Sequence, residues 1–253
     1  MNKIVLITGA TSGIGLATAE IFALNNYDLI ITGRREDRLS ELETNLKSKY
    51  DIRILSLCFD VRVLSEVEDK LGNLPEKWSD IDILVNNAGL AVGLNHIDNG
   101  VIDDWERMID TNVKGLLYVT RIISPGMVSR AKGHILNIGS VAGKEVYENG
   151  NVYCASKFAV DALSRGMRID LVNHNIKVTN IAPGLVDTEF SIVRFKGDSD
   201  KAVAPYKGMK PLSGEDIADV LYYCATLPEH VNINDVLIMP TAQASATVVN
   251  RNN

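Results

Sequence analysis

A tyrosine and a lysine stand four positions apart, at Tyr153 and Lys157, inside a run from about 152 to 172 that reads as a helix. Side chains at positions i and i+4 lie over one another on a helix, so a phenol and an ammonium with this spacing can point into one site. A nearby cation lowers the pKa of a phenol because it favours the phenolate. The pair suits a general acid or base, although the same spacing is common on exposed helices.

The elements that would position this pair form an alternating pattern along the chain. Short runs rich in isoleucine, valine and leucine are separated by helical patterns and lie at 3–8, 27–32, 52–59, 81–86, 133–138, 176–181 and 235–239. Such uninterrupted apolar strands are typical of a parallel sheet buried on both faces. We therefore predict an α/β fold, a doubly wound parallel sheet of about seven strands with helices on both faces. Ligands of such sheets bind at the carboxyl ends of the strands.

The loop after the first predicted strand is rich in glycine. It runs Thr8-Gly9-Ala10-Thr11-Ser12-Gly13-Ile14-Gly15, and a helix is expected to begin near Ile14. Glycines let a backbone approach a pyrophosphate closely, and a helix N-terminus offers free N–H groups to its charge. The spacing is Gly-x-x-x-Gly-x-Gly, and a simple tight turn is the alternative. Its place after the first strand favours dinucleotide binding by Gly9, Thr11, Ser12, Gly13, Ile14 and Gly15.

Two arginines, Arg34 and Arg35, follow the second predicted strand. An NAD site usually has an acidic residue near this point, which would repel a 2′-phosphate. Guanidinium groups instead bind a phosphate dianion, and the hydroxyl of Ser12 can add a hydrogen bond. We therefore predict NADP as the cofactor, with two solvated arginines as the alternative.

Two further strand ends carry candidate cofactor contacts. Asp60 and Val61 close the third strand, and the carboxylate can accept a hydrogen bond from an adenine amino group. Asn87, Ala88 and Gly89 follow the fourth, where small residues permit close backbone approach and amides tie neighbouring loops. Each stretch alone could be a turn. Together with the glycine-rich loop they favour a nucleotide site.

Composition limits the remaining functions. The 253 residues carry a net charge of -6, 46% are hydrophobic and 23% are charged, as in a soluble globular protein, so we expect neither nucleic acid nor membrane as a partner. No linker divides the chain, so one domain over 1–253 is expected. The apolar run after Met1-Asn2-Lys3 is too short for a signal peptide, which predicts a cytoplasmic protein. Three separated cysteines and four scattered histidines lack metal-ligand spacing, so no metal is predicted.

The ordered set of these motifs resembles the short-chain dehydrogenase/reductase superfamily over nearly the full length. The shared positions are 8–15, 86–89, Asn112, Ser140, Tyr153, Lys157 and the pair Pro183-Gly184. The resemblance implies a Rossmann fold with strand order 3-2-1-4-5-6-7 and hydride exchange between a nicotinamide cofactor and an alcohol or carbonyl. It also implies a homotetramer.

The resemblance also implies a role for each matching residue. Tyr153 would be the general acid or base, and Lys157 would bind the nicotinamide ribose and lower the pKa of the phenol. Ser140 would hydrogen-bond the substrate oxygen, and Asn112 would hold a water in the proton relay. Pro183, Gly184, Val186 and Thr188 would face the nicotinamide carboxamide.

Within the superfamily, the stretches 184–198 and 227–234 are similar to the NADP-dependent 3-hydroxy acid dehydrogenases, which act on L-serine, L-allo-threonine, 3-hydroxyisobutyrate or 3-hydroxypropionate/malonic semialdehyde. The segment Ile238-Met239-Pro240-Thr241 replaces the Asp-Gly-Gly of many relatives, as it does in this branch. Another carbonyl reductase, for instance of 3-oxoacyl thioesters, and a non-catalytic NADP-binding protein remain alternatives.

The substrate is expected to lie under a long, partly basic segment at about 186–211. We expect this connection to be a lid without clear secondary structure, and Arg194 to bind the carboxylate of a hydroxy acid, since a guanidinium fork matches that group. Glu145, Tyr147 and Leu185 are further candidates for the pocket. No role is predicted for the tail after Pro240.

The two arginines give the first prediction. Arg34→Ala combined with Arg35→Ala should weaken NADPH binding far more than NADH binding, because only NADPH carries the 2′-phosphate. Titration of each cofactor against the double variant measures this, and equal losses for both would contradict the assignment.

Overall fold

The computed structural model describes residues 2–252, so positions 1 and 253 of the expected domain lie outside the described residues. All seven strands belong to one parallel sheet in the order β3-β2-β1-β4-β5-β6-β7. They are β1 (Ile4–Ile7), β2 (Asp28–Gly33), β3 (Ile54–Cys58), β4 (Ile81–Asn86), β5 (Gly133–Ile138), β6 (Ile176–Pro183) and β7 (Asp235–Ile238). The predicted doubly wound sheet and its strand order are confirmed.

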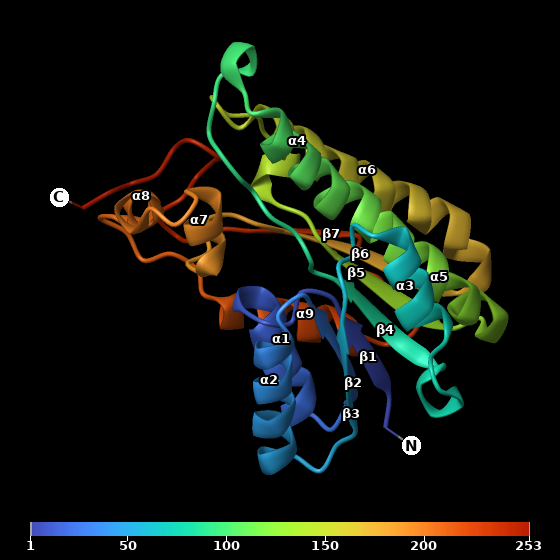
Figure 1. Ribbon diagram of the computed structural model, residues 1–253. Helices are drawn as coiled ribbons and strands as arrows, with labels where there is room; N and C mark the ends of the chain where they lie inside the picture. Colours follow the sequence, from blue (N-terminus) through green and yellow to red (C-terminus); the bar gives the residue numbers. More distant parts are fainter. Residues whose placement is uncertain (1, 253) are drawn as a thin grey trace.

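Helices cover both faces of this sheet (Figure 1). The first group lies on one side and comprises α1 (Gly13–Leu24), α2 (Glu36–Lys49) and α9 (Gly214–Thr226). The second group lies on the other side and comprises α3 (Leu64–Gly72), α4 (Ile102–Ile109), α5 (Leu116–Arg130) and α6 (Asn151–Leu171). The strand order reverses between β1 and β4, where a crevice for a ligand forms in such folds.

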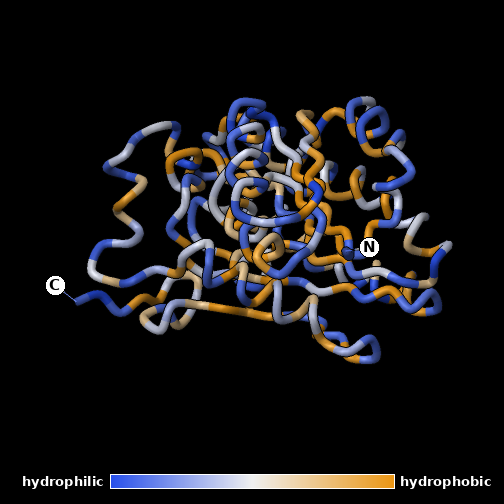
Figure 2. Tube along the Cα trace, turned by 90° about the horizontal axis from the view of Figure 1, so that it is seen from below, coloured by the Kyte–Doolittle hydropathy of each residue, from blue (hydrophilic) through white to orange (hydrophobic). Residues whose placement is uncertain are grey.

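The strands are apolar because both of their faces are buried. Val5 and Ile7 of β1 pack with Phe22 of α1 in one cluster, whereas Ile4 and Leu6 belong to the cluster on the opposite face. This alternation follows from the two-residue period of a strand. Hydrophobic stretches accordingly lie toward the inside of the molecule and hydrophilic ones at its outer turns (Figure 2).

The segment after β6 is helical, and the expectation of an irregular lid is wrong in this respect. It contains α7 (Glu189–Arg194), α8 (Ser199–Val203) and a 3₁₀ turn at Ala204–Tyr206. The short helices form because Thr188 and Asp198 cap them, accepting hydrogen bonds from the backbone N–H groups of Phe190 and Lys201. This segment lies beside the C-terminal tail at the carboxyl end of the sheet (Figure 1).

A π-helical turn at Asp110–Gly115 joins α4 to α5, and nothing in the sequence pattern indicated it. Such turns often occur at functional sites. Within residues 2–252, no helix combines the length and apolar composition needed to cross a bilayer. The same stretch contains no group of three histidine, cysteine or acidic side chains placed to hold a metal ion.

A buried histidine makes the stability of the fold depend on pH. His134 in β5 shares a hydrogen bond of 2.8 Å with the Thr179 hydroxyl, and burial together with Lys177 lowers its pKa to about 3. The unfolded chain takes up a proton near pH 6.5, whereas the folded chain stays neutral at this position until about pH 3. The contribution of His134 to the free energy of unfolding is therefore fully present above pH 6.5, and it is lost progressively as the pH falls from 6.5 toward 3.

We predict that the free energy of unfolding falls by about 2 kcal/mol from this residue alone between pH 7 and pH 5. His134→Asn should remove that part of the pH dependence, and the exposed His230→Asn is the matched control. Urea unfolding at both pH values measures the slopes. An unchanged slope in His134→Asn would contradict the prediction.

Candidate active site

A cavity of about 600 Å³ opens at the carboxyl edge of the sheet and extends from the glycine-rich loop to α6 and α7. It brings together nearly all of the candidate residues from the sequence. Those lining it are Gly9, Thr11, Ser12, Gly13, Ile14, Arg34, Arg35, Asp60, Val61, Asn87, Ala88, Gly89, Ser140, Tyr153, Lys157, Pro183, Gly184, Val186, Thr188 and Arg194. Tyr147 and Leu185 also line it, whereas Gly15, Asn112 and Glu145 do not.

The glycine-rich loop is shaped by conformations that only glycine adopts easily. Gly9 and Gly13 have φ angles of +68° and +53°, in the left-handed region. A Cβ atom on Gly13 would lie 3.0 Å from the Cβ of Thr188, so the start of α7 packs closely over this loop. Gly15 packs behind the loop, where a Cβ would meet the Gly9 carbonyl oxygen.

The amide of Asn87 ties the fourth strand end to the first. Its Nδ2 donates to the carbonyl oxygens of Thr8 and Gly9, at 2.8 and 3.0 Å. The hydroxyl of Thr8 accepts in return from the backbone N–H groups of Asn87 and Ala88. These hydrogen bonds fix the glycine-rich loop against the end of β4, as expected for an amide that ties neighbouring loops.

Arg35 is built into this loop. Its guanidinium donates to the hydroxyl of Thr11 at 2.7 Å and to that of Ser12 at 3.0 Å, and its Nη1 pairs with Glu189. Arg34 is more exposed and lies 3.7 Å from the carboxylate of Asp60. A cationic site with two hydroxyl groups thus stands at the end of β2, where an acidic residue would be expected for NAD.

Asp60 has protein partners of its own. The Arg62 side chain donates to Oδ1 of this carboxylate at 3.1 Å and to Oδ2 at 2.6 Å, and the backbone N–H of Arg62 also donates to Oδ1. The adenine contact expected for Asp60 therefore stays a prediction. In this structure the carboxylate binds Arg62 and lies near Arg34 at the wall of the cavity.

Tyr153 and Lys157 both lie on α6 and are buried, with 8% and 6% of their surfaces exposed. The ammonium of Lys157 donates a hydrogen bond of 2.9 Å to the Ile138 carbonyl at the end of β5 and lies 5.9 Å from the centroid of the tyrosine ring. Burial lowers the pKa of Lys157 to about 8. The two side chains share one site, as their spacing predicted.

The phenol is not made acidic by this spacing alone. Burial raises the pKa of Tyr153 above its ordinary value, and Tyr147 adds to the rise. A hydrogen bond with Ser140 and the charge of Arg194 oppose it but do not outweigh burial. The net direction of the pKa of Tyr153 is therefore upward, and the lowering by Lys157 that the spacing predicted is not among the causes of the shift.

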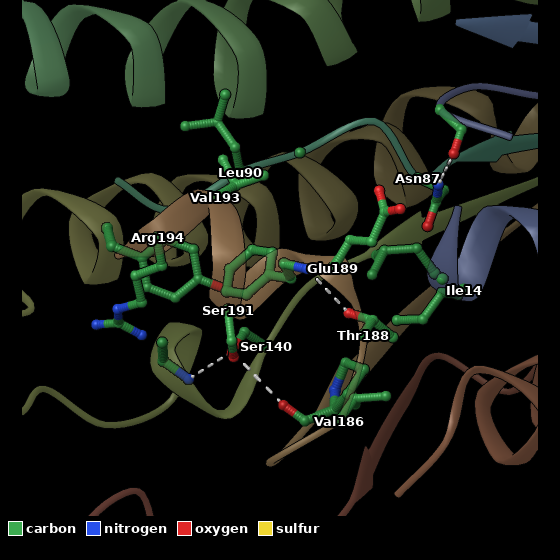
Figure 3. A pocket seen from close by; sticks show the side chains of 18 of the residues that line it. Ile14, Asn87, Leu90, Ser140, Val186, Thr188, Glu189, Ser191, Val193 and Arg194 are labelled. Atoms are coloured by element: carbon green, nitrogen blue, oxygen red, sulfur yellow. Dashed lines mark hydrogen bonds between the residues drawn. The ribbon is translucent and has the colours of Figure 1, made fainter. Parts of the chain in front are cut away.

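Ser140 follows β5 and has an extended backbone. Its hydroxyl accepts a hydrogen bond from the N–H of Ala142 at 3.1 Å and lies 3.5 Å from the Pro183 carbonyl oxygen (Figure 3). This fixes the hydroxyl in the cavity between the ends of β5 and β6.

Asn112 lies in the π-helical turn and is buried. Its side chain accepts from the N–H of Leu90 at 2.8 Å and donates to the carbonyl of Leu90 and the hydroxyl of Ser156. The side chain therefore fixes the loop after β4, and the expected role in holding a water stays a prediction.

Arg194 enters the cavity from the end of α7 (Figure 3). Its guanidinium lies 5.4 Å from the ring centroid of Tyr147 and 5.5 Å from that of Tyr153, and it donates to the Tyr147 hydroxyl at 2.7 Å. Its Nε is buried and has no hydrogen-bond partner within residues 2–252. A cation with an unused donor therefore stands beside the phenol.

The sequence indicated no role for Phe190 or Gln243, and it did not predict the contact that Glu145 makes with the tail. Phe190 of α7 packs on Tyr153, with ring centroids 5.8 Å apart. Gln243 of the tail accepts a hydrogen bond of 2.8 Å from the N–H of Leu185, and the carboxylate of Glu145 accepts one from Ala246. A short apolar run in the segment 186–211 and a lone glutamine in a polar tail carry no pattern that would indicate these contacts.

Comparison with known proteins agrees with this geometry. Residues 3–198 match the family described as short chain dehydrogenase, and the chain belongs to that family. An NADP-dependent 3-hydroxy acid dehydrogenase, YdfG, of Salmonella typhi is 49% identical over 96% of this chain and 97% of its own. The NADP-dependent 3-hydroxy acid dehydrogenase of Schizosaccharomyces pombe is 43% identical over 99% and 97% of the two chains.

A solved structure shows the same likeness. The closed form of a serine dehydrogenase complexed with NADP+ superposes with a TM-score of 0.91, at 48% identity, over 96% of this chain and 97% of that chain. The protein is thus a dehydrogenase of this family, which acts on a CH–OH group, and the family predicted from the motifs is confirmed.

Proposed function

We propose that this protein transfers a hydride between NADP(H) and a small 3-hydroxy acid of the L-serine, L-allo-threonine, 3-hydroxyisobutyrate or 3-hydroxypropionate type. The observation that carries the proposal is the Arg194 guanidinium, which lies 5.5 Å from the Tyr153 ring and has a buried Nε without a partner in residues 2–252. A substrate carboxylate satisfies such a group. The similarity to 3-hydroxy acid dehydrogenases supports the same substrate class.

The cavity fits NADP. The glycines of the loop carry no side chains, so a pyrophosphate can approach the loop backbone closely. Arg35, together with the hydroxyls of Thr11 and Ser12, offers the donors that suit a 2′-phosphate. Gly89 leaves room beside Lys157, where a Cβ would come within 3.6 Å of the ammonium. When bound, the cofactor supplies or accepts the hydride.

The side chains of the protein handle the substrate and its proton. The hydroxyl groups of Ser140 and Tyr153 donate to the substrate oxygen, on which negative charge develops during carbonyl reduction. Tyr153 carries a proton at neutral pH, as a phenol does at its ordinary pKa of about 10, and can donate it to that oxygen. Lys157 keeps two further N–H donors beyond its bond to Ile138, which suits a ribose hydroxyl.

The segment 186–211 is proposed to be the lid over this site, since α7 supplies both Phe190 and Arg194 to it. We retain the expectation that the protein is a cytoplasmic homotetramer.

A substrate panel tests the proposed reaction. With NADP+, L-serine, L-allo-threonine and 3-hydroxyisobutyrate should be oxidised, and with NADPH malonic semialdehyde should be reduced. The free acids should have higher kcat/KM values than a 3-oxoacyl thioester. Preference for the thioester would favour a different carbonyl reductase, and cofactor binding without any turnover would favour a non-catalytic protein.

Tyr153→Phe tests the proton donor. The variant should bind NADPH with unchanged affinity but lose roughly three or more orders of magnitude in turnover, because the acid-base group is gone. Tyr222→Phe, in the aromatic cluster with Phe22 outside the cavity, is the matched control and should keep its rate. A near-normal rate for Tyr153→Phe would rule out the mechanism.

Arg194→Met tests the carboxylate site. Loss of a charge-assisted hydrogen bond should raise the KM for L-serine about 10- to 100-fold, with little change for its methyl ester, which lacks the carboxylate. Lys201→Met removes an exposed lysine of the same segment and should leave both values unchanged. If Arg194→Met leaves the KM for L-serine unchanged, another group binds the carboxylate.

A further inference from the structure

The C-terminal end of α7 is fastened to α4 and to the loop after β4. The ammonium of Lys196 pairs at 2.8 Å with a carboxylate oxygen of Asp104, the third residue of α4. Two residues earlier, the carbonyl oxygen of Arg194 accepts a hydrogen bond of 3.0 Å from the N–H of Gly93. The guanidinium of Arg194 thus lies in the cavity, while its backbone is tied to the neighbouring loop.

Asp104 is a buried carboxylate, with 4% of its side chain exposed. Its Oδ2 has no donor in hydrogen-bond geometry within residues 2–252, so the ammonium of Lys196 acts on it as a charge. The first turn of α4 also favours a negative charge. Burying a carboxylate is costly unless a partner compensates for it, so Asp104 fixes the place of Lys196.

Gly93 makes room for this ion pair. Its φ angle is +73°, in the left-handed region, and a Cβ atom there would lie 2.6 Å from Oδ2 of Asp104. A side chain at this position would therefore displace the carboxylate. The same residue supplies the backbone donor for Arg194 and the space for the partner of Lys196.

Lys196 stands at a position that helices usually give to glycine. The N–H of Lys196 donates to the carbonyl of Val193 at 3.1 Å, and that of Gly197 donates to the carbonyl of Ile192 at 2.9 Å, which closes α7 around a left-handed residue. The φ angle of Lys196 is +53°, which is unfavourable for a residue with a Cβ atom. Glycine would end the helix more easily, so the lysine indicates a role for its side chain.

We propose that Asp104 is a positioning residue which, through Lys196, holds Arg194 where its guanidinium can bind a substrate carboxylate. The inference rests on the proposed role of Arg194. A helix of six residues is marginal by itself, so the place of its last residue depends on contacts outside the helix. Tyr153 is carried by α6, so loss of the ion pair should raise the KM for an acid without an equal loss of kcat.

Asp104→Asn keeps the size of the side chain and removes its charge. The KM for L-serine should rise about three- to tenfold, the size expected for one ion pair with an exposed partner, and kcat should change less than about twofold. The KM for L-serine methyl ester and the Kd for NADPH should stay within about twofold of the parent values. An equal rise for acid and ester would show that the pair only stabilises the fold.

Asp103→Asn is the matched control for this variant. Asp103 is the neighbouring acid of α4, is exposed and lies 3.8 Å from Arg107. Its replacement should leave the KM for both substrates and the Kd for NADPH unchanged.

Lys196→Gly separates the charge of the lysine from its backbone. Glycine suits the left-handed conformation better, yet the KM for L-serine should rise as it does in Asp104→Asn, because the ion pair is lost. The two changes together should cost no more than either alone, since both remove one contact. A parent-like KM in Lys196→Gly, or additive effects in the double variant, would overturn the inference.

Trypsin reports on the position of Arg194 without any substrate. Cleavage after Arg194 needs local opening of α7, so Asp104→Asn and Lys196→Gly should each be cut there about three- to tenfold faster than the parent. Cleavage after Lys49, at the end of α2, should stay unchanged. Equal rates after Arg194 would show that the ion pair does not hold this residue.

The two assays distinguish this inference from the proposed function. If Arg194→Met raises the KM for L-serine and Asp104→Asn does not, Asp104 has no positioning role and the carboxylate site stands. If Asp104→Asn speeds cleavage but neither variant changes the KM, the proposed carboxylate site is wrong, and with it the effect of Asp104 on the substrate.

Discussion

The ammonium of Lys157 is buried at the carboxyl edge of the sheet and donates to the carbonyl oxygen of Ile138. Burying an ammonium is costly unless it is hydrogen-bonded, so this contact fixes α6 against the end of β5. Tyr153 and Ser140 take their positions from the same two elements. The parallel sheet thereby places a cation, a phenol and a hydroxyl in one cavity although they come from different parts of the chain.

The strands, the glycine-rich loop and the pair of arginines after β2 could be predicted because each leaves a local signal. Apolar runs such as 81–86 are long enough to identify, and Gly9 and Gly13 occupy backbone conformations that favour their type. The acidity of Tyr153 could not be inferred from its spacing to Lys157. Desolvation depends on what packs over the ring, and Phe190 and Arg194 come from a distant segment.

The sequence did not predict the secondary structure of the segment 186–211, which we propose as the lid. Its helices are five or six residues long and are stabilised by the caps Thr188 and Asp198, which are too local to form a hydrophobic period. The contacts of Glu189, Lys196 and Gln243 join residues far apart in the sequence. Single-sequence patterns carry no information on such pairs, which is why a role for the tail was not predicted.

The tail has a practical consequence for anyone who alters this protein. Gln243 supports the backbone at Leu185, Arg251 donates to the carbonyl of Lys207, and Asn252 donates to that of Gly208. A purification tag joined after these residues would lie next to the segment 186–211, which we propose as the lid, and could disturb these contacts. Conversely, the tail supports the segment proposed to cover the substrate. Exchanging the last dozen residues therefore offers a way to change substrate preference without altering Ser140, Tyr153 or Lys157.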